Sequence, residues 1–299
     1  MLRSKIEGLP DDHRSKPKCL FELSQLFDSV GHYEERRQLL THALKLSRER
    51  RDDLQVARIL MTLSEANTLV FGLHKEGIEQ AEEALEIYKR FGDTAGQAEC
   101  SGNLAWCLFG DYQFGAAEDI LSRTIDSLPE KGQDFLLCRL HSFLGMVYNR
   151  KGEKEKGIDH LETALGIAYP FNWHRELYSI HYCLADVFGA QDEFEDANTH
   201  IERAKSHTVD DTHNLAHAVQ MQARIWVQQR RLEDARLEAS RALEIYEKLG
   251  AAQDARMCRR LLQQIERVIE GESTSSESDF SCESSDRTPF PIPADAFPS

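Results

Sequence analysis

One sequence pattern recurs about every 40 residues along the 299-residue chain, and this period restricts the possible folds more than any other feature. Six segments align without internal gaps, and a small residue marks the same column in each. The column holds Ala43, Ala84, Thr124, Ala164, Ala204 and Ala242, at successive spacings of 41, 40, 40, 40 and 38 residues. A regular period of this length is typical of stacked repeat proteins, in which neighbouring repeats bury one another's apolar faces.

Each repeat is predicted to contain two amphipathic helices, A and B. Around the small column, apolar residues recur at spacings of three, four and seven, which marks one face of helix B. Helix A lies about twenty residues upstream, for example in RLHSFLGMVY and IHYCLADVF. A second column, of which five members are Gly or Ala, lets the two helices approach closely. It holds Arg36, Gly77, Ala117, Gly157, Ala197 and Ala235.

The predicted turns and boundaries have local chemistry that ends or begins a helix. Between helices A and B stand Gly31, Gly72, Gly110 and Gly152, or the polar pair Gln191 and Asp192. Glycine ends a helix readily because it adopts the left-handed conformation without steric cost. Between repeats, a terminal glycine is followed by an aspartate that we expect to cap the next helix. The pairs concerned are Gly92 with Asp93, Gly132 with Asp134, and Gly250 with Asp254.

The two ends of the chain differ from the repeats. After the last repeat, an apolar stripe predicts a helix that covers the exposed end of the stack, as repeat arrays require. The stripe holds Met257, Leu261, Leu262, Ile265, Val268 and Ile269. The final segment is rich in Ser, Pro and acids, a composition that predicts disorder. The predicted plan is an N-terminal extension (1–16), six repeats (about 17–51, 52–92, 93–132, 133–170, 173–208 and 212–249), a capping helix (250–270) and a disordered acidic tail (271–299).

Charge and composition exclude several classes of function. The net charge is −15, and nine of these negative charges remain when residues 270–299 are set aside. Because nucleic-acid binding depends on Lys and Arg at phosphates, the acidic body predicts no nucleic-acid partner. No apolar run reaches the length of a membrane span, and no secretory signal is found, so we predict no membrane association. Seven cysteines without a CxxC pair fit reduced thiols in the cytoplasm, with the nucleus as the alternative compartment.

No arrangement of residues predicts catalysis or a cofactor. The chain lacks GxSxG, HExxH, GxGxxG and GxxxxGK[ST], so we predict neither an enzyme nor a nucleotide site. His213 and His217 are spaced like two metal ligands on one helix face, but no third ligand is fixed beside them by spacing. We therefore predict no metal site, and we assign no chemistry to Cys100 and Cys107.

The pattern L-G/A-x2-Y/F, then G-x-Y/F, then A-x6-A-L resembles the tetratricopeptide repeat (TPR). The fourth repeat shows the resemblance best, with Leu144, Gly145, Tyr148, Gly152, Gly157 and Ala164. It implies an all-α fold, a right-handed α-α superhelix of about six helix-turn-helix repeats closed by the capping helix. The 40-residue period is longer than the family's commonest 34 residues. It is similar to that of the kinesin light chains and LGN-type adaptors, and of the TPR arrays in fungal signalling ATPases.

The resemblance implies a binding surface along helix A of each repeat. In the similar adaptors an Asn on helix A faces the bound peptide, and Asn103 matches it. Family positions on the concave wall map here to Asn103, Trp106, Phe109, Arg139, Met146, Asn149, Arg150, Tyr182, Asp186 and Arg224. An alternative interpretation is that Trp106 and Phe109 belong to the core between repeats, because aromatic residues are favoured in both settings.

The predicted function is that of a non-enzymatic scaffold or adaptor, which holds a segment of a partner protein in its concave groove. Arg139 and Arg150 would then select acidic flanks on that partner. The alternative is a regulatory or sensor repeat module that works with a signalling ATPase, acting by self-association or effector sensing. Neither alternative requires a cofactor.

Overall fold

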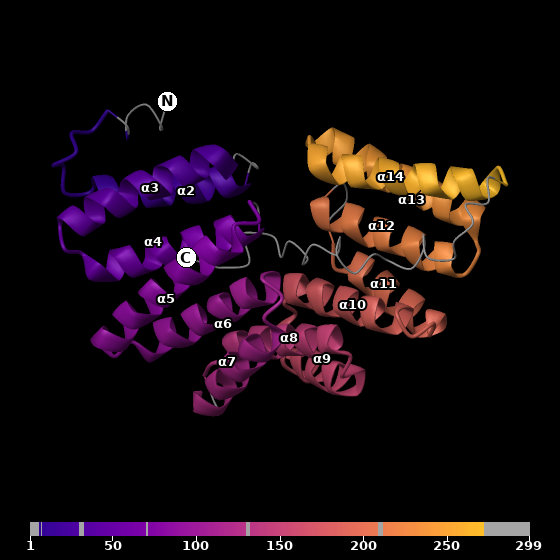
Figure 1. The fold of residues 1–299 in the computed structure, drawn as a ribbon, viewed down its shortest axis with the longest axis horizontal. Helices are drawn as coiled ribbons and strands as arrows, with labels where there is room; N and C mark the ends of the chain where they lie inside the picture. The colour runs from indigo at the N-terminus through magenta and orange to yellow at the C-terminus, as the bar shows by residue number, and fades with distance from the viewer. Residues whose placement is uncertain are drawn as a thin grey trace. The chain divides into compact units, whose positions relative to one another are not determined.

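The structure, a computed structural model, describes residues 6, 8–29, 33–69, 71–129, 132–208 and 212–271. In these ranges the chain forms thirteen α-helices, a 3-10 helix η1 (Tyr169–Phe171), and no strand (Figure 1). The predicted all-α class is confirmed. The expected turn glycine Gly31 and tail residues 272–299 lie outside the described residues, as does part of the expected N-terminal extension.

The helices follow one another as predicted A and B helices, six pairs with one helix after them. The pairs are α2 (Lys16–Ser29) and α3 (Tyr33–Glu49), α4 (Asp53–Leu69) and α5 (His74–Phe91), α6 (Thr94–Gly110) and α7 (Phe114–Ser127), α8 (Asp134–Lys151) and α9 (Lys154–Ala168), α10 (His174–Gly189) and α11 (Phe194–Ser206), and α12 (His213–Gln228) and α13 (Leu232–Leu249). The last helix is α14 (Ala252–Ile269).

The chain divides into two compact units between Arg150 and Lys151. Among the described residues, unit 1 contains α2 to α8, and unit 2 contains α9 to α14. In unit 1, α3 packs on α4 and α5 packs on α6, so successive hairpins stack; in unit 2, α11 packs on α12 and α13 on α14. The two helices of the fourth hairpin fall in different units.

Both small columns lie where the helices press together. Ala43, Ala84, Ala164, Ala204 and Ala242 are fully buried, and Thr124 is 8% exposed. In the second column, Ala117, Ala197 and Ala235 are also fully buried, and Gly77 and Gly157 are buried. Arg36 is the only large residue in this column, and its side chain is also buried, with 1% exposed. The columns therefore mark the helix contacts, as the sequence predicts.

Substituting Gly77 tests how closely α5 approaches α4. A Cβ atom at Gly77 would overlap Thr68 Oγ1 and lie 3.0 Å from the backbone oxygen of Ser64. Ala favours a helix by about 1 kcal/mol over Gly, but overpacking costs about 1 to 3 kcal/mol. We expect Gly77→Ala to lower the unfolding free energy by about 1 kcal/mol. At the exposed Gly166 in α9, a Cβ would have no atom within 4 Å, so Gly166→Ala should stabilise. Chemical denaturation would check both, and equal effects would contradict the close approach.

The turns between helices A and B share a backbone conformation rather than a residue. The second residue before helix B has a positive φ in each of the five turns that the structure describes at this position. The residues are Gly72, Tyr112, Gly152, Asp192 and Arg230, with φ of 65°, 61°, 81°, 61° and 61°. The expectation that Gly110 forms its turn is wrong, because Gly110 ends α6 and Tyr112 takes the left-handed position.

The three predicted boundary pairs differ in the structure. Gly132 has a left-handed φ of 87°, but Asp134 is the first residue of α8 and does not precede it. Gly92 ends α5 with φ 67°, and the side chain of Asp93 caps α6 by accepting a hydrogen bond from Gly96 N at 2.9 Å. Gly250 likewise ends α13 with φ 70°. Asp254, however, does not cap α14, because that helix begins at Ala252 and Asp254 lies inside its first turn. Its carboxylate is free to face another helix instead.

Helix α14 covers the end of unit 2, as predicted. Ala255, Cys258 and Ile265 are at most 2% exposed, in one apolar cluster with Ala239 and Ala242 of α13. Leu261 and Leu262 pack against the same cluster. The predicted stripe needs a correction, since two of its members, Met257 and Ile269, are each 38% exposed. The buried stripe is rotated toward the smaller residues Ala255 and Cys258, which let the helices come closer.

Candidate functional site

The predicted binding face of α6 is mostly buried in unit 1. Trp106 is 4% exposed and Phe109 5%, and their rings stack with centroids 5.3 Å apart. Phe143 of α8 lies 5.3 Å from Trp106 and completes the aromatic cluster. This arrangement supports the alternative interpretation, in which Trp106 and Phe109 form core between repeats. Their placement on an open binding face is corrected accordingly.

Asn103 joins two helices of unit 1. It is 2% exposed, and its side-chain nitrogen donates to Met61 O and to Ser64 Oγ of α4, both at 2.8 Å. Both amide protons are therefore used inside the protein. Buried polar groups need such partners, since an unmet donor costs about 1 to 3 kcal/mol. In this conformation Asn103 has no amide proton for a partner backbone, which corrects the role that the resemblance implies.

Helix α8 presents the more accessible part of the predicted face. Met146 packs against the core of unit 1 but remains partly exposed, as do Asn149 and Arg150. Arg139 is 9% exposed, with its guanidinium 5.5 Å from the ring centre of Phe143 and 6.0 Å from that of Phe135. Arg139, Met146 and Arg150 follow at spacings of seven and four, so they share one face of α8.

The remaining predicted residues belong to unit 2. Tyr182 of α10 is 6% exposed, and its ring centre lies 6.1 Å from that of the buried Tyr178. Tyr182 is therefore part of the core, which corrects its assignment to an open surface. Asp186 of α10 and Arg224 of α12 are partly exposed. The predicted face thus consists of α6 and α8 residues in unit 1 and a separate α10 and α12 set in unit 2.

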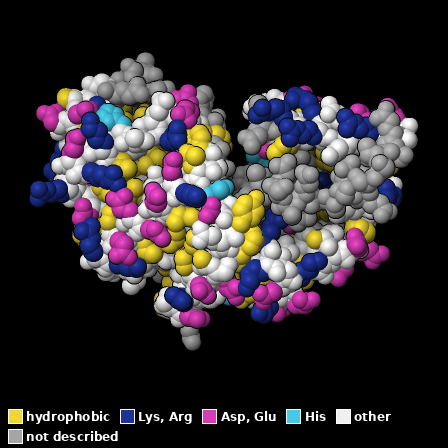
Figure 2. Space-filling model, viewed as in Figure 1, with side chains coloured by type: hydrophobic (Ala, Val, Ile, Leu, Met, Phe, Trp, Pro, Cys, Tyr) yellow, Lys and Arg dark blue, Asp and Glu magenta, His cyan; other side chains and the backbone are white. Residues whose placement is uncertain are grey.

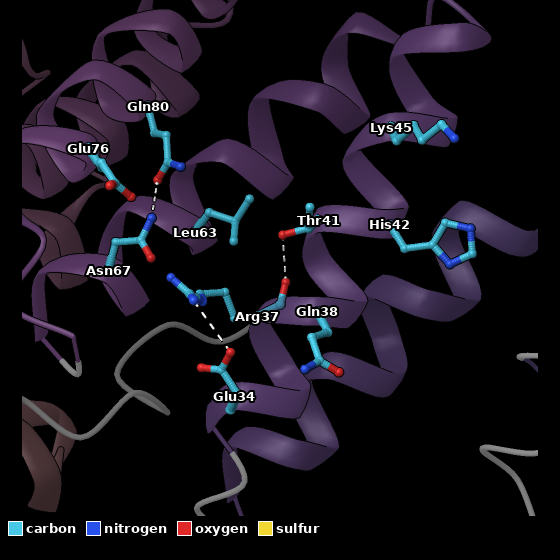
Figure 3. A pocket seen from close by; sticks show the side chains of 10 residues that line it. All are labelled: Glu34, Arg37, Gln38, Thr41, His42, Lys45, Leu63, Asn67, Glu76 and Gln80. Atoms are coloured by element: carbon cyan, nitrogen blue, oxygen red, sulfur yellow. Dashed lines mark hydrogen bonds and ion pairs between the residues drawn. The ribbon is translucent and has the colours of Figure 1, made fainter.

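A polar pocket of about 540 Å³ opens on unit 1 between α3, α4 and α5 (Figure 3). Asn67 of α4 lies in it, and its side-chain nitrogen donates to Gln80 Oε1 at 2.9 Å. The lining mixes both signs of charge, with Arg37 and Lys45 opposed by Glu34 and Glu76. Sequence reasoning missed this pocket because the charged residues of α3 have the pattern of an ordinary solvated helix face. The mixed charge suits a polar or zwitterionic group.

The buried thiols are poor nucleophiles. Burial raises the pKa of Cys100 and of Cys107 to about 12, so both remain protonated at neutral pH. Cys100 Sγ donates to the backbone oxygen of Ala81 at 3.2 Å, and Thr68 Oγ1 lies 3.1 Å from Cys107 Sγ. These contacts give the two cysteines structural roles, in agreement with the assignment of no chemistry to them.

Unit 2 contains a histidine cluster that the sequence pattern does not reveal. His181 is fully buried on α10, with Tyr169 Oη 2.7 Å from its Nε2 and His200 Nδ1 3.0 Å from its Nδ1. Its ring also stacks on that of His207, with centroids 5.9 Å apart. Burial, followed by the nearby His200 and Arg203, lowers the pKa of His181 to about 3. The cluster is thus neutral at its centre.

A second histidine group in unit 2 meets a carboxylate from another helix. His213 and His217 lie one turn apart on α12, and Asp254 of α14 places Oδ2 2.9 Å from His213 Nε2. One side-chain ligand atom from each of the three residues lies within 4.8 Å of the others. The sequence supplied the two histidines, but Asp254 is 41 residues from His213 and could be found only in the folded chain.

The surface of the described helices carries charges of both signs. On the face shown in Figure 2, Lys and Arg side chains are interspersed with Asp and Glu over the helices of unit 1. Such mixing is typical of a solvated surface. Within the part of the chain that the structure describes, no helix has both the length and the apolarity to cross a membrane.

Comparison of the sequence with protein-family models gives no match, and comparison with curated proteins gives none either. The three-dimensional structure matches solved structures of repeat proteins. A Rap protein complexed with Competence and Sporulation Factor has a TM-score of 0.66 at 14% identity, over 91% of this chain and 80% of that one. The chain therefore shares its fold with this solved structure, although only 14% of the aligned residues are identical.

Two further solved structures identify the type of repeat. A signal transduction ATPase with a tetratricopeptide repeat sensor, from Pyrococcus horikoshii, has a TM-score of 0.61 at 15% identity, over 90% of this chain and 41% of that one. A kinesin light chain with TPR-like repeats, from Podosopora anserina, has a TM-score of 0.50 at 16% identity, over 66% and 96%. The fold is therefore that of the TPR-like helical repeat proteins.

Proposed function

We propose that this chain is a non-enzymatic adaptor that binds a segment of a partner protein along the exposed part of its helix-A face. One observation carries the proposal. On α8, the partly exposed Met146 lies on the same helix face as Arg139 and Arg150. An adaptable apolar side chain beside arginines is a combination enriched where binding energy concentrates.

Charge indicates which segments would bind. The chain as a whole has a net charge of −15, so it repels acidic partners at long range. Arg150 on α8 and Arg224 on α12 are partly exposed cations, and each attracts a carboxylate at short range. We therefore propose that the partner segment has an apolar anchor flanked by acidic residues. Such a segment would bind to one of the two units, or one segment would bind to each. A nucleic-acid partner is not part of this proposal, because the body is acidic.

Charge reversal on α8 tests the proposed surface. We expect Met146→Glu and Arg150→Glu each to reduce capture of the same partner at least fivefold, because one buries a charge at the anchor and the other repels the acidic flank. Helicity and the melting midpoint should remain nearly unchanged, since both positions are partly exposed. Affinity capture from lysate with quantitative mass spectrometry measures the effect. Raising salt should weaken the part that depends on Arg150 more.

Matched controls separate this surface from general effects of charge. Leu237 of α13 is 71% exposed, and Leu237→Glu makes the same chemical change as Met146→Glu on a helix B. Arg123 of α7 has a side chain 82% exposed, and Arg123→Glu matches Arg150→Glu. Both controls should keep wild-type capture. Capture that survives the α8 substitutions, or that is lost in the controls, would place the binding surface elsewhere.

A sensor module that works with a signalling ATPase is the second candidate. The repeat-sensor ATPase from Pyrococcus horikoshii matches 90% of this chain, which supports it, although this chain covers only 41% of that protein. Such a module would act by self-association or by binding an effector, and the polar pocket on unit 1 offers a place for a small polar effector. Sedimentation of the purified chain discriminates. A monomer that captures partners favours the adaptor, and defined oligomers favour the sensor.

A further inference from the structure

Three side chains from two helices converge at the end of unit 2. His213 and His217 come from α12, and Asp254 comes from the first turn of α14. The rings of the two histidines lie nearly perpendicular, with centroids 4.4 Å apart. With Asp254 Oδ2 already 2.9 Å from His213 Nε2, one ligand atom of each side chain falls within 4.8 Å of the other two.

We infer that His213, His217 and Asp254 form a binding site for a divalent transition-metal ion, with Zn²⁺ as the ion that fits best. Two imidazoles and one carboxylate are a donor set that Zn²⁺ uses widely. Histidines four residues apart on a helix present both rings to one point, as paired ligands require. Tetrahedral Zn²⁺ with bonds of about 2.0 to 2.1 Å needs its ligand atoms about 3.3 Å apart. The three ligand atoms lie within 4.8 Å of one another, so ion binding requires them to move closer together.

The surroundings hold the two histidine rings in place. The ring of Tyr246 on α13 packs edge-on against both, with centroids 5.7 Å from His213 and 5.6 Å from His217. Its hydroxyl donates to Gln220 Oε1 at 2.9 Å, so it is already occupied as a donor. Aromatic support of this kind fixes ligand orientation in the way that outer-shell contacts do around metal ions. Tyr246 is therefore a positioning residue and not a ligand.

The ion would join the capping helix to the last hairpin. Asp254 belongs to α14 and the histidines belong to α12, so binding at one point bridges two helices that are not consecutive. The His213 and Asp254 side chains are 39% and 25% exposed, so the ion reaches the site from solvent and water completes its coordination. Three protein ligands leave one position of a tetrahedral ion open to water. The bound ion would then stabilise the docked position of α14.

A simple ion pair between His213 and Asp254 is the competing interpretation. It accounts for the 2.9 Å contact between His213 and Asp254 and does not involve His217, whose ring lies 4.4 Å from that of His213. The two interpretations differ in a measurable way. If the contact is only an ion pair, Zn²⁺ does not stabilise the protein. If it is part of a metal site, Zn²⁺ binding depends on all three side chains.

Metal titration of the full-length chain, stripped with a chelator and dialysed, tests the inference. We expect Zn²⁺ to bind one ion per chain and to raise the melting midpoint of unit 2, whereas Mg²⁺ at the same concentration leaves it unchanged. Co²⁺ should give the visible absorption bands of a low-symmetry site of nitrogen and oxygen ligands. Asp254→Asn and His217→Gln should each weaken Zn²⁺ binding at least tenfold, as should His213→Gln at the more exposed position.

The other histidines of unit 2 provide the matched control. His207 belongs to the separate cluster, where its Nδ1 lies 3.1 Å from that of His174. His207→Gln removes a histidine from the same unit and should keep wild-type Zn²⁺ affinity. Absence of stoichiometric Zn²⁺ binding would overturn the inference, as would unchanged binding in the Asp254 and His217 variants. Loss of binding in His207→Gln alone would assign the metal to the other cluster and would overturn it too. If one variant folds poorly by circular dichroism, the other two and the Co²⁺ spectrum still decide.

Discussion

A chain truncated after Gly250 is expected to aggregate at concentrations where the full-length chain stays dispersed, because the truncation removes α14. That helix buries Ile265, Cys258 and Ala255 against α13, and Leu261 and Leu262 pack beside them. Burying these side chains contributes on the order of 5 kcal/mol, which is comparable with the whole stability of a small unit. Without α14, the apolar side of α12 and α13 faces water and is free to associate. Light scattering and size-exclusion chromatography measure the result.

Truncation after Gly271 is the matched control. It removes residues 272–299 from the same end of the chain and keeps α14 whole. We expect its melting midpoint to stay within a few degrees of the full-length value. Aggregation of both truncated chains would show that residues 272–299 contribute to stability, and a well-behaved chain ending at Gly250 would show that α14 is not a cap.

Acidification from pH 7 to pH 5 is expected to destabilise unit 2 through His181. The pKa of His181 in the folded protein is lowered to about 3 by burial, whereas an unfolded histidine titrates near 6.5. The contribution of His181 to the unfolding free energy is therefore complete above pH 6.5. It is lost as the pH falls, because the unfolded chain binds the proton more strongly than the folded protein does. At pH 5 this loss is about 2 kcal/mol from His181 alone. His200 and His207, whose pKa values are also lowered by burial, add to the loss.

The measurement is the unfolding free energy from denaturant titrations at pH 7, 6 and 5. His181→Gln should reduce the slope of the unfolding free energy against pH by an amount that corresponds to at most one proton taken up on unfolding. The substitution also removes the contacts with Tyr169 and His200, which lowers stability at every pH. A slope that does not change in His181→Gln would mean that other groups carry the acid sensitivity.

The sequence predicts the helices well because close packing between helices requires the same residue types in every repeat. A small residue every 40 positions is required wherever helix B presses on its neighbours, and all six members of that column are buried. Apolar spacing then indicates which face is buried, and terminal glycines such as Gly92 mark helix ends. These signals are local, so one sequence is enough to detect them.

The candidate site is predicted less well, because exposure depends on contacts between distant residues. Trp106 and Phe109 occupy helix-A positions that line a groove in the resembling family, yet Phe143 packs against Trp106 and the pair is buried. Periodicity cannot separate an aromatic residue that lines a groove from one that fills a core. Asp254 illustrates the same limit, since its partner His213 is 41 residues away. No spacing rule links a helix start to a histidine in a different hairpin.

The shared left-handed turn shows that the geometry of these hairpins does not depend on one residue type. Two of the five described turns use glycine, at Gly72 and Gly152, and three use Tyr112, Asp192 and Arg230. A residue with a side chain in this conformation costs about 1 to 2 kcal/mol, while forty residues of a folded protein contribute on the order of 2 to 6 kcal/mol. A hairpin that packs against its neighbours therefore tolerates a residue other than glycine at this position. Any one turn can therefore change its residue while the backbone geometry of its hairpin stays the same.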